Sequence, residues 1–230
     1  MFLPIKQPFL VSGRIKWKAE MTEALRLTLN EAGFVAEQPS TAINRAVDKG
    51  VIKAKLHSRG KTSFRQIGTP ELCYLAIAGL IEKDLTPAAR RKVYKAVRRL
   101  PSAEYRLDLG IIVLKLAKID KSITERLARL ADIKAHIDEG AREPQLKGVG
   151  LPVHVVASLA RDQTVEEITE DYPALSCKQV EAAVEYAKIY PRTGRPLPVR
   201  SFKRLLGDLA VAGVWDGEGE AEPTKPRTMS

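Results

Sequence analysis

The apolar positions between residues 148 and 196 recur at helical spacing and predict three short helices. Their members are Val153, Val156, Ala157 and Ala160, then Val165 and Ile168, then Val180, Ala183, Val184 and Ala187. The second and third helices open with the capping-box pattern, at Thr164 to Glu167 and at Ser176 to Gln179, in which side-chain oxygens satisfy unpaired amides. Pro173 ends the second helix, because proline disfavours helical geometry in the residue before it. We expect a compact trihelical unit here.

A second pattern, over residues 31–50, is typical of a helix-turn-helix. We expect a first helix over residues 31–37, a turn near Gln38-Pro39, and a second helix that Gly50 ends in a left-handed conformation. The second helix has an apolar face of Ile43, Ala46 and Val47 and an opposite polar face of Thr41, Asn44, Arg45 and Asp48. Such polar residues reach base edges in the major groove, where Asn pairs with adenine and Arg with guanine. The pattern predicts a DNA-reading helix, and an ordinary solvated face is the alternative.

A basic hairpin is expected directly after this helix. Residues 51–56 and 63–67 can form two strands around the segment 57–62, with Gly60 in the turn. Its cations would contact phosphates as those of a wing do, and a merely solvated surface hairpin is the alternative. The candidate DNA-binding residues of the helix and hairpin are Ser40, Thr41, Asn44, Arg45, Lys49, Lys53, Lys55, Arg59, Lys61 and Arg65.

The distribution of charge favours a polyanionic partner. The chain has a formal net charge of +10, and its basic residues cluster in the N-terminal half. Residues 45–65 hold seven Lys and Arg against the single acid Asp48, and residues 90–99 hold six more. Clustered positive charge of this kind usually indicates nucleic acid.

Two helices opened by Thr-Pro follow the hairpin, and a connecting region leads from them to the trihelical unit. The helix after Pro70 is apolar nearly all round and is expected to be buried, whereas the helix after Pro87 has a basic outer face that either extends the phosphate footprint or is only solvated. Residues 105–119 predict one or two strands, Ser122 to Glu125 the start of a helix, and residues 135–148 a short strand and loop. A strand without a partner in its own chain would pair with a second subunit. Residues 101–147 are therefore a candidate dimerisation region.

The C-terminal region predicts an extended arm and an amphipathic helix. Its apolar stripe and neighbouring cations are Phe202, Leu205, Leu206 and Leu209 with Arg200, Lys203 and Arg204. This arrangement suits insertion of the helix into a groove of a partner protein, and packing on the trihelical unit of the same chain is the alternative. Residues 214–230 are expected to be disordered. Residues 1–20 form an arm, a strand or an upstream extension.

Catalytic and metal-binding patterns are absent from the sequence. His57, His136 and His154 have no ligand spacing, and Cys73 and Cys177 lie in apolar helical patterns. There is no Gly-rich phosphate loop, nucleophile elbow or HExxH motif. The chain also shows neither an apolar run of about 20 residues nor a secretory signal. We expect a cytoplasmic protein that is not an enzyme and that binds no cofactor or metal.

Several of these segments resemble a known family. GLPVHVVASL, TVEEITEDYPALSCKQVEAAVEYA and YPRTGRP are similar to the domain of unknown function 433, found in VapB-like antitoxins of type II toxin–antitoxin pairs. The helix-turn-helix segment is similar to the N-terminal region of the same family at Glu31, Ala32, Phe34, Val35, Ala36, Asn44, Arg45 and Ala46. Two departures are the missing Thr-Arg before Pro152 and the pair Glu37-Gln38, where the family commonly has a glycine and an apolar residue.

The resemblance implies a mainly α protein with minor β structure, built from an N-terminal winged helix-turn-helix domain and a C-terminal trihelical domain. The expected boundaries are 1–20 for the arm, 21–100 for the DNA-binding domain, 101–147 for the linker, 148–196 for the antitoxin domain, 197–213 for the toxin-binding arm and 214–230 for the tail. The implied function is that of an antitoxin that neutralises a PIN-like ribonuclease toxin and autoregulates its operon on operator DNA, as a homodimer or a larger complex with the toxin. The toxin-binding residues would be the seven of the C-terminal stripe. A free-standing transcriptional regulator and, less strongly, a protein-interaction adaptor are the alternatives.

Overall fold

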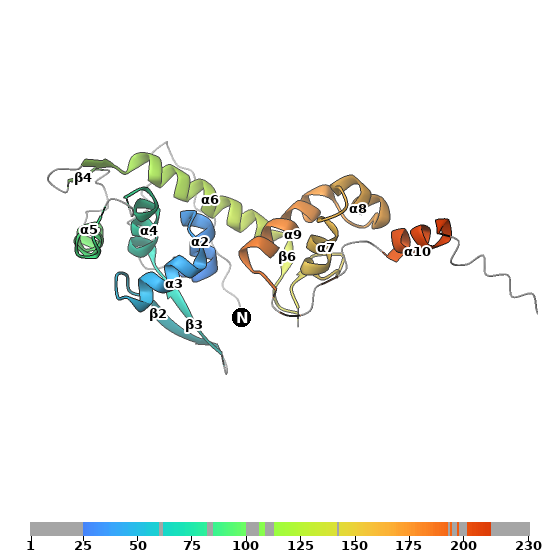
Figure 1. Ribbon diagram of the computed structural model, residues 1–230, viewed down its shortest axis with the longest axis horizontal. Coiled ribbons are helices and arrows are strands. Elements are labelled where there is room, and N and C mark those ends of the chain that lie inside the picture. Colours follow the sequence, from blue (N-terminus) through green and yellow to red (C-terminus); the bar gives the residue numbers. More distant parts are fainter. Residues whose placement is uncertain are drawn as a thin grey trace, which may run out of the picture. The chain divides into compact units, whose positions relative to one another are not determined.

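The computed structural model describes residues 25–59, 62–81, 85–99, 106–108, 113–141, 143–192 and 202–212, together with Gly194 and Leu197. The chain divides into two compact units, Met1–Ile133 and Lys134–Ser230, and the border falls inside helix α6 (Ala117–Ala135). The predicted fold class is confirmed, because the structure is mainly α-helical with minor β structure (Figure 1). The expected arm over residues 1–20 and the expected tail over residues 214–230 lie outside the described residues.

The first unit begins with strand β1 (Leu27–Thr28) and helices α2 (Leu29–Ala36) and α3 (Ser40–Asp48). Helix α2 begins two residues before its predicted start, because Thr28 and Glu31 form a capping box of their own. Between the helices, a Cβ on Gly33 would lie 2.7 Å from the backbone oxygen of Gln38, so only glycine fits beside this turn. Gly50 has φ 63°, which confirms the left-handed conformation predicted after α3.

A three-stranded antiparallel sheet in the order β1-β3-β2 follows, with β2 at Lys55–Arg59 and β3 at Thr62–Ile67. The first strand of the hairpin starts later than predicted. The reason is that the backbone amide of Val51 donates to the Ala46 oxygen at the end of α3 and Ile52 turns into the core. His57 and Ser58 consequently lie within β2, paired with Phe64 and Ser63, and not in the predicted turn. The predicted turn residue Gly60 is outside the described residues.

Two further helices complete the main core of the first unit. Helix α4 (Thr69–Ile81) is buried over most of its length, as its apolar sequence predicts. Helix α5 (Pro87–Arg99) packs on α4 and is amphipathic, with Val93, Tyr94 and Val97 buried. The fully buried side chains of α2, α3, β3 and α4 include Val35, Ile43, Ile67, Leu72 and Ile77.

The connecting region differs from its prediction in two respects. Strands β4 (Arg106–Asp108) and β5 (Val113–Lys115) pair with each other, as do β6 (Ile137–Asp138) and β7 (Gln145–Leu146). This pairing within the chain removes the argument for a strand contributed by a second subunit. Helix α6 starts at Ala117 and not at Ser122, since the buried Ile123 and half-buried Ile119 extend the helical pattern upstream.

The second unit contains the three predicted short helices, α7 (Val153–Leu159), α8 (Val165–Asp171) and α9 (Cys177–Ile189). Both predicted capping boxes are confirmed, with Thr164 and Ser176 accepting from the amides of Glu167 and Gln179. The core of this unit includes Leu146, Val153, Val156, Leu159, Ile168, Val180 and Ala183. A further helix, α10 (Phe202–Val211), follows toward the C-terminus. Across the described ranges, no helix has both the length and the apolar character needed to cross a bilayer.

Candidate nucleic-acid interface and a helix bound to an acidic cluster

Helix α3 presents the polar face that the sequence predicts. Thr41, Arg45 and Lys49 are exposed, and Ser40 and Asn44 are half-buried. On the other side Ile43 is completely buried, while Ala46 and Val47 are only partly covered. The helix is therefore held by its apolar face and offers short polar and basic side chains to solvent.

Arg65 of β3 joins the hairpin to α3. Its Nη1 donates to Oδ1 of Asp48 over 2.7 Å and to Oδ1 of Asn44 over 3.4 Å. The structure thus brings together Asn44 and Arg65, two predicted DNA-binding residues, and gives Arg65 a bracing role that the sequence pattern did not predict. The Asn44 carbonyl oxygen keeps one lone pair, and its amide keeps two hydrogens, which is the set that an adenine edge pairs with.

The start of the hairpin carries exposed cations, and β2 also carries an exposed apolar side chain on the face opposite to Lys55. Lys53 and Lys55 are exposed at the start of the hairpin. Leu56 is 71% exposed, and it lies opposite Arg65 in the β2–β3 register, so both side chains are on the same face of the sheet. Sequence reasoning placed Leu56 at the end of a strand and missed it as a surface residue; an apolar side chain in this position can contact a thymine methyl group.

Two predicted phosphate-binding residues cannot be placed fully. Arg59 ends β2, but its side chain is outside the description, and Lys61 is outside it altogether.

The turn between α2 and α3 is held from α6. Arg126 donates from Nη1 to the backbone oxygen of Phe34 over 3.2 Å and from Nη2 to the carboxylate of Glu37. Glu37 itself has φ 54° and ψ 38°, a left-handed conformation that is favourable for glycine and costly for most other residues. The turn therefore has a backbone requirement that glycine meets most easily, and this chain meets it with a glutamate held by Arg126.

Tyr94 fixes α5 against the start of the hairpin. Its hydroxyl donates to Oε1 of Glu71 over 2.6 Å and accepts from the backbone amide of Lys53 over 3.3 Å. Burial, followed by the hydrogen bond to Glu71, raises the pKa of Tyr94 to about 12. The hydroxyl is therefore protonated at physiological pH and keeps its donor role in this network. Its ring also contacts Tyr74 edge to face, which adds to the attachment of α5 to α4.

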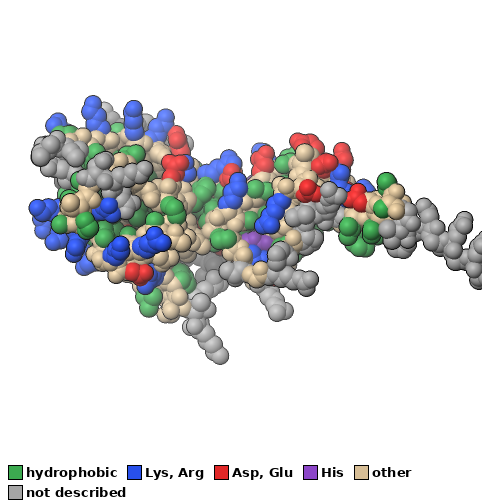
Figure 2. All heavy atoms as spheres, viewed as in Figure 1, with side chains coloured by type: hydrophobic (Ala, Val, Ile, Leu, Met, Phe, Trp, Pro, Cys, Tyr) green, Lys and Arg blue, Asp and Glu red, His purple; other side chains and the backbone are tan. Residues whose placement is uncertain are grey.

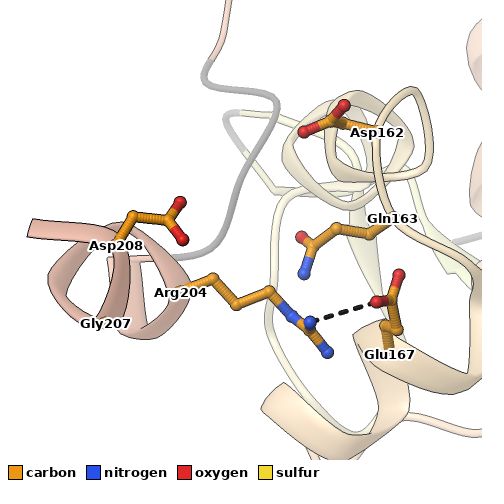
Figure 3. A pocket seen from close by; sticks show the side chains of 6 residues that line it. All are labelled: Asp162, Gln163, Glu167, Arg204, Gly207 and Asp208. Carbon is orange, nitrogen blue, oxygen red and sulfur yellow. Dashed lines mark hydrogen bonds and ion pairs between the residues drawn. The ribbon is translucent and has the colours of Figure 1, made fainter. Parts of the chain in front are cut away.

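In the second unit, Arg204 of α10 lies against three carboxylates of α8, of which Figure 3 shows Glu167. Its Nε is 2.9 Å from Oδ2 of Asp171, its Nη1 is 3.1 Å from Oε1 of Glu167, and its Nη2 is 3.8 Å from Oε2 of Glu170. The side chain of Asp171 is only 4% exposed and also accepts from the Gln163 amide over 2.9 Å. The hydrogen bond to Asp171 raises the pKa of Arg204 further above its usual value, so the guanidinium is always charged. We call Glu167, Glu170 and Asp171 the α8 acidic cluster.

The apolar stripe of α10 remains largely exposed in this arrangement. Phe202 is 70% exposed, Leu205 and Leu206 are exposed as well, and Leu209 is half-buried. Lys203 approaches Asp171 at 3.9 Å. Of the seven residues predicted to bind a toxin, the chain itself engages the cations Arg204 and Lys203, leaves Phe202, Leu205 and Leu206 exposed, and half-buries Leu209. The seventh, Arg200, is outside the described residues.

The hollow between α8 and α10 is polar and lined by Asp162, Gln163, Glu167, Arg204, Gly207 and Asp208 (Figure 3). One of its acids, Glu167, is paired with the Arg204 guanidinium, and the described residues contain no group of three or more His, Cys, Asp or Glu arranged to hold a metal ion. This chemistry fits the binding of a basic side chain.

A family model described as "Protein of unknown function (DUF433)" matches residues 141–187. The matched segment includes β7, α7, α8 and most of α9, together with both capping boxes, and it confirms the resemblance of this segment to the domain of unknown function 433. A comparison with curated proteins finds no match.

Proposed function

We propose that this chain is a DNA-binding antitoxin of a type II toxin–antitoxin pair. In this proposal the first unit is a winged helix-turn-helix domain that binds operator DNA, and the second unit with α10 binds and neutralises a PIN-like ribonuclease toxin. The protein would act in the cytoplasm as a homodimer or as a larger complex with the toxin. The observation that carries the proposal is the exposed polar face of α3 beside a basic antiparallel hairpin.

The geometry of α3 supports reading of bases by this helix. Thr41 lies in the first turn of α3, where side chains of a recognition helix reach base edges, and Asn44 and Arg45 follow along the same helix, with Arg45 in its last turn. Arg65 orients the Asn44 amide, so less side-chain entropy is lost when Asn44 meets a base. Lys53 and Lys55 supply contacts to phosphates, which set register without reading sequence.

The family match and α10 support the toxin-binding half of the proposal. The match to DUF433, a family of unknown function, covers most of the trihelical unit, and the resemblance of the same segment to VapB-like antitoxins implies a toxin as its partner. The exposed stripe of Phe202, Leu205 and Leu206 has the spacing of a helix that enters a groove of a partner. Arg204 already binds a carboxylate cluster, and the metal-binding carboxylates of a PIN-like ribonuclease would offer the same chemistry.

Growth rescue tests the antitoxin half. The small open reading frame next to this gene is induced alone and then together with the full chain, and arrest followed by rescue is the expected outcome. The variant Leu205→Asp/Leu206→Asp should lose rescue, because it places charge on the stripe. Val211→Asp is the matched control, since this exposed residue lies on another side of the same helix. Rescue by the stripe variant would show that α10 is not part of the interface with the toxin.

Binding to the DNA upstream of the gene tests the other half. Asn44→Ala should reduce discrimination between the operator and a scrambled duplex by about 1–3 kcal/mol, the usual worth of a bidentate base contact. Operator binding without a toxic neighbour would favour the alternative of a free-standing regulator. The proposal fails completely if neither rescue nor sequence preference is found.

A further inference from the structure

We propose that the basic face of helix α5 is a second DNA-binding surface, which contacts phosphates beside the hairpin and reads no bases. We call Arg91, Lys92, Lys95, Arg98 and Arg99 the α5 basic face. This inference rests on the proposed DNA-binding function of the first unit and adds to it a surface on an element outside the helix-turn-helix and the hairpin.

The α5 basic face is one-sided and contains no acid. All five of its cations are exposed, whereas Val93, Tyr94 and Val97 on the other side are buried. No Asp or Glu occurs between Pro87 and Arg99. Like charges three or four residues apart, such as Arg91 with Lys95 and Lys95 with Arg99, destabilise a helix by about 0.2–0.5 kcal/mol for each pair. A polyanion laid along the helix would relieve this repulsion.

The cations of this face are not neutralised within the described part of the chain. Arg91 donates from Nε to the Pro87 oxygen over 3.5 Å, and Arg98 lies 5.8 Å from the centre of the Tyr94 ring. Neither contact involves a carboxylate, and within the described residues Lys92, Lys95 and Arg99 form no ion pair. The cations therefore remain available to an external anion.

Tyr94, on the buried side of α5, holds this helix beside the start of the hairpin. The Tyr94 hydroxyl accepts from the backbone amide of Lys53, and the exposed cations Lys53 and Lys55 follow at the start of β2. Because Tyr94 also donates to Glu71 in the buried interior, the position of α5 is set by the core. Figure 2 shows Lys and Arg side chains gathered over the first unit, which contains both surfaces.

The chemistry of the face fits phosphates better than bases. The major groove, about 12 Å wide, admits one helix, and α3 is the helix with short polar side chains for it. The α5 basic face offers only long cationic side chains, which bind phosphates regardless of sequence. Contacts of this type release counterions, so each one makes the slope of log affinity against log salt concentration more negative by about 0.9.

The test compares the full chain with Lys92→Gln/Lys95→Gln/Arg99→Gln, by fluorescence anisotropy of an upstream DNA fragment and a scrambled duplex at several salt concentrations. The variant should bind both duplexes more weakly by the same factor. Its slope of log affinity against log salt concentration should be less negative by up to about 2.7 if all three contacts are lost. Lys118→Gln/Lys178→Gln/Lys188→Gln is the control, because it removes the same charge from exposed positions on α6 and α9. An equal loss of DNA affinity in the control would show that the effect comes from net charge alone, and it would overturn the inference.

The remaining outcomes separate this inference from the proposed function. Unchanged affinity of the α5 variant, with sequence preference intact, overturns the inference alone. Loss of preference without loss of general affinity also overturns it, since α5 would then read bases. If the unaltered chain binds neither duplex, the inference and the proposed function fail together. A second measurement needs no variant: operator DNA should protect Lys92 and Lys95 of the unaltered chain from acetylation, and equal labelling with and without DNA would contradict the proposal.

Discussion

At the scale of single residues, Glu37 shows how the helix-turn-helix is closed. Its backbone is left-handed, a conformation in which most residues other than glycine are disfavoured by about 1–2 kcal/mol. Arg126 holds both the Glu37 carboxylate and the Phe34 oxygen, which keeps the turn in place. The turn geometry therefore depends on one long-range ion pair together with a strained backbone.

A pair of substitutions separates these two contributions. Glu37→Gly and Glu37→Ala both remove the carboxylate, but only glycine adopts the left-handed backbone without cost. We expect the glycine variant to be more stable than the alanine variant by about 1 kcal/mol in urea unfolding. Equal stability of the two variants would show that the backbone relaxes elsewhere and that the turn carries no such cost.

His154 of α7 makes the second unit sensitive to acid. Burial lowers the pKa of His154, the positive charge of Arg192 lowers it further, and Glu143 opposes both. Its imidazole is neutral in the folded state at a pH where the unfolded chain already binds a proton. The stability that this contributes is present above about pH 6.5, which is the pKa of histidine in the unfolded chain. It is lost as the pH falls from there through the lowered pKa of His154 in the folded state.

We therefore expect the free energy of unfolding to decrease between about pH 7 and pH 5.5, a range in which few carboxylates titrate. Chemical denaturation of the chain and of His154→Gln over this range measures the effect, and the variant should have a flatter profile. His136→Gln, in the same unit, is the control and should retain the slope. A decrease that persists in His154→Gln would assign the acid sensitivity to another group.

Contacts between distant residues are the part of the candidate site that the sequence could not provide. The polar face of α3 follows from spacing alone, because neighbours on a helix face are three or four residues apart. The contact of Arg65 with Asp48 and that of Arg204 with Asp171 depend instead on tertiary packing. Sequence reasoning assigned Arg65 to phosphate and Arg204 to a partner, with packing of its helix on the trihelical unit as the alternative. No local pattern identifies a carboxylate on another element.

At the scale of elements, local signals predicted most of the helices and some were misleading. The capping boxes at Thr164 and Ser176 were recognised because their hydrogen bonds join residues three apart. The same Ser-x-x-Glu pattern at Ser122 lies inside α6, where the apolar residues before it already continue the helix. Capping patterns therefore predict a helix start only where the upstream residues break the helical periodicity.

The cap of α8 gives a direct test of such a signal. Thr164→Ala should destabilise the second unit by about 1 kcal/mol, because it leaves the amide of Glu167 without its acceptor. Thr169→Ala is the matched control: its hydroxyl donates to the Glu166 oxygen within the helix and caps no terminus. Thermal unfolding measures both, and an equal effect at the two positions would argue against a role of the cap.

At the scale of the whole molecule, the chain contains two units with separate buried cores. Ile43 is fully buried in the first unit and Ile168 in the second. Figure 2 shows that the chemistry of their surfaces also differs, with Lys and Arg gathered on the first unit and Asp and Glu along α8 in the second. We expect each core to determine the stability of its own unit.

Truncation of each core tests this independence. Ile43→Ala and Ile168→Ala should each cost about 2–5 kcal/mol, the usual range for loss of a buried isoleucine side chain. Hydrogen exchange should show reduced protection of the amides in the altered unit and unchanged protection in the other. A loss of protection throughout the chain in either variant would mean that the two cores unfold as one cooperative body.

The ion pairs between Arg204 and the α8 acidic cluster affect how readily a protease cleaves α10. Proteases cut segments that can unfold locally, and a trypsin-like enzyme must draw an arginine side chain into its own acidic pocket. While Glu167 and Asp171 hold the guanidinium, that side chain is withheld from such an enzyme. A binding partner whose carboxylates replace those of α8 around Arg204 would protect the side chain in the same way. Cleavage after Arg204 is thus hindered for as long as one set of carboxylates or the other holds its guanidinium.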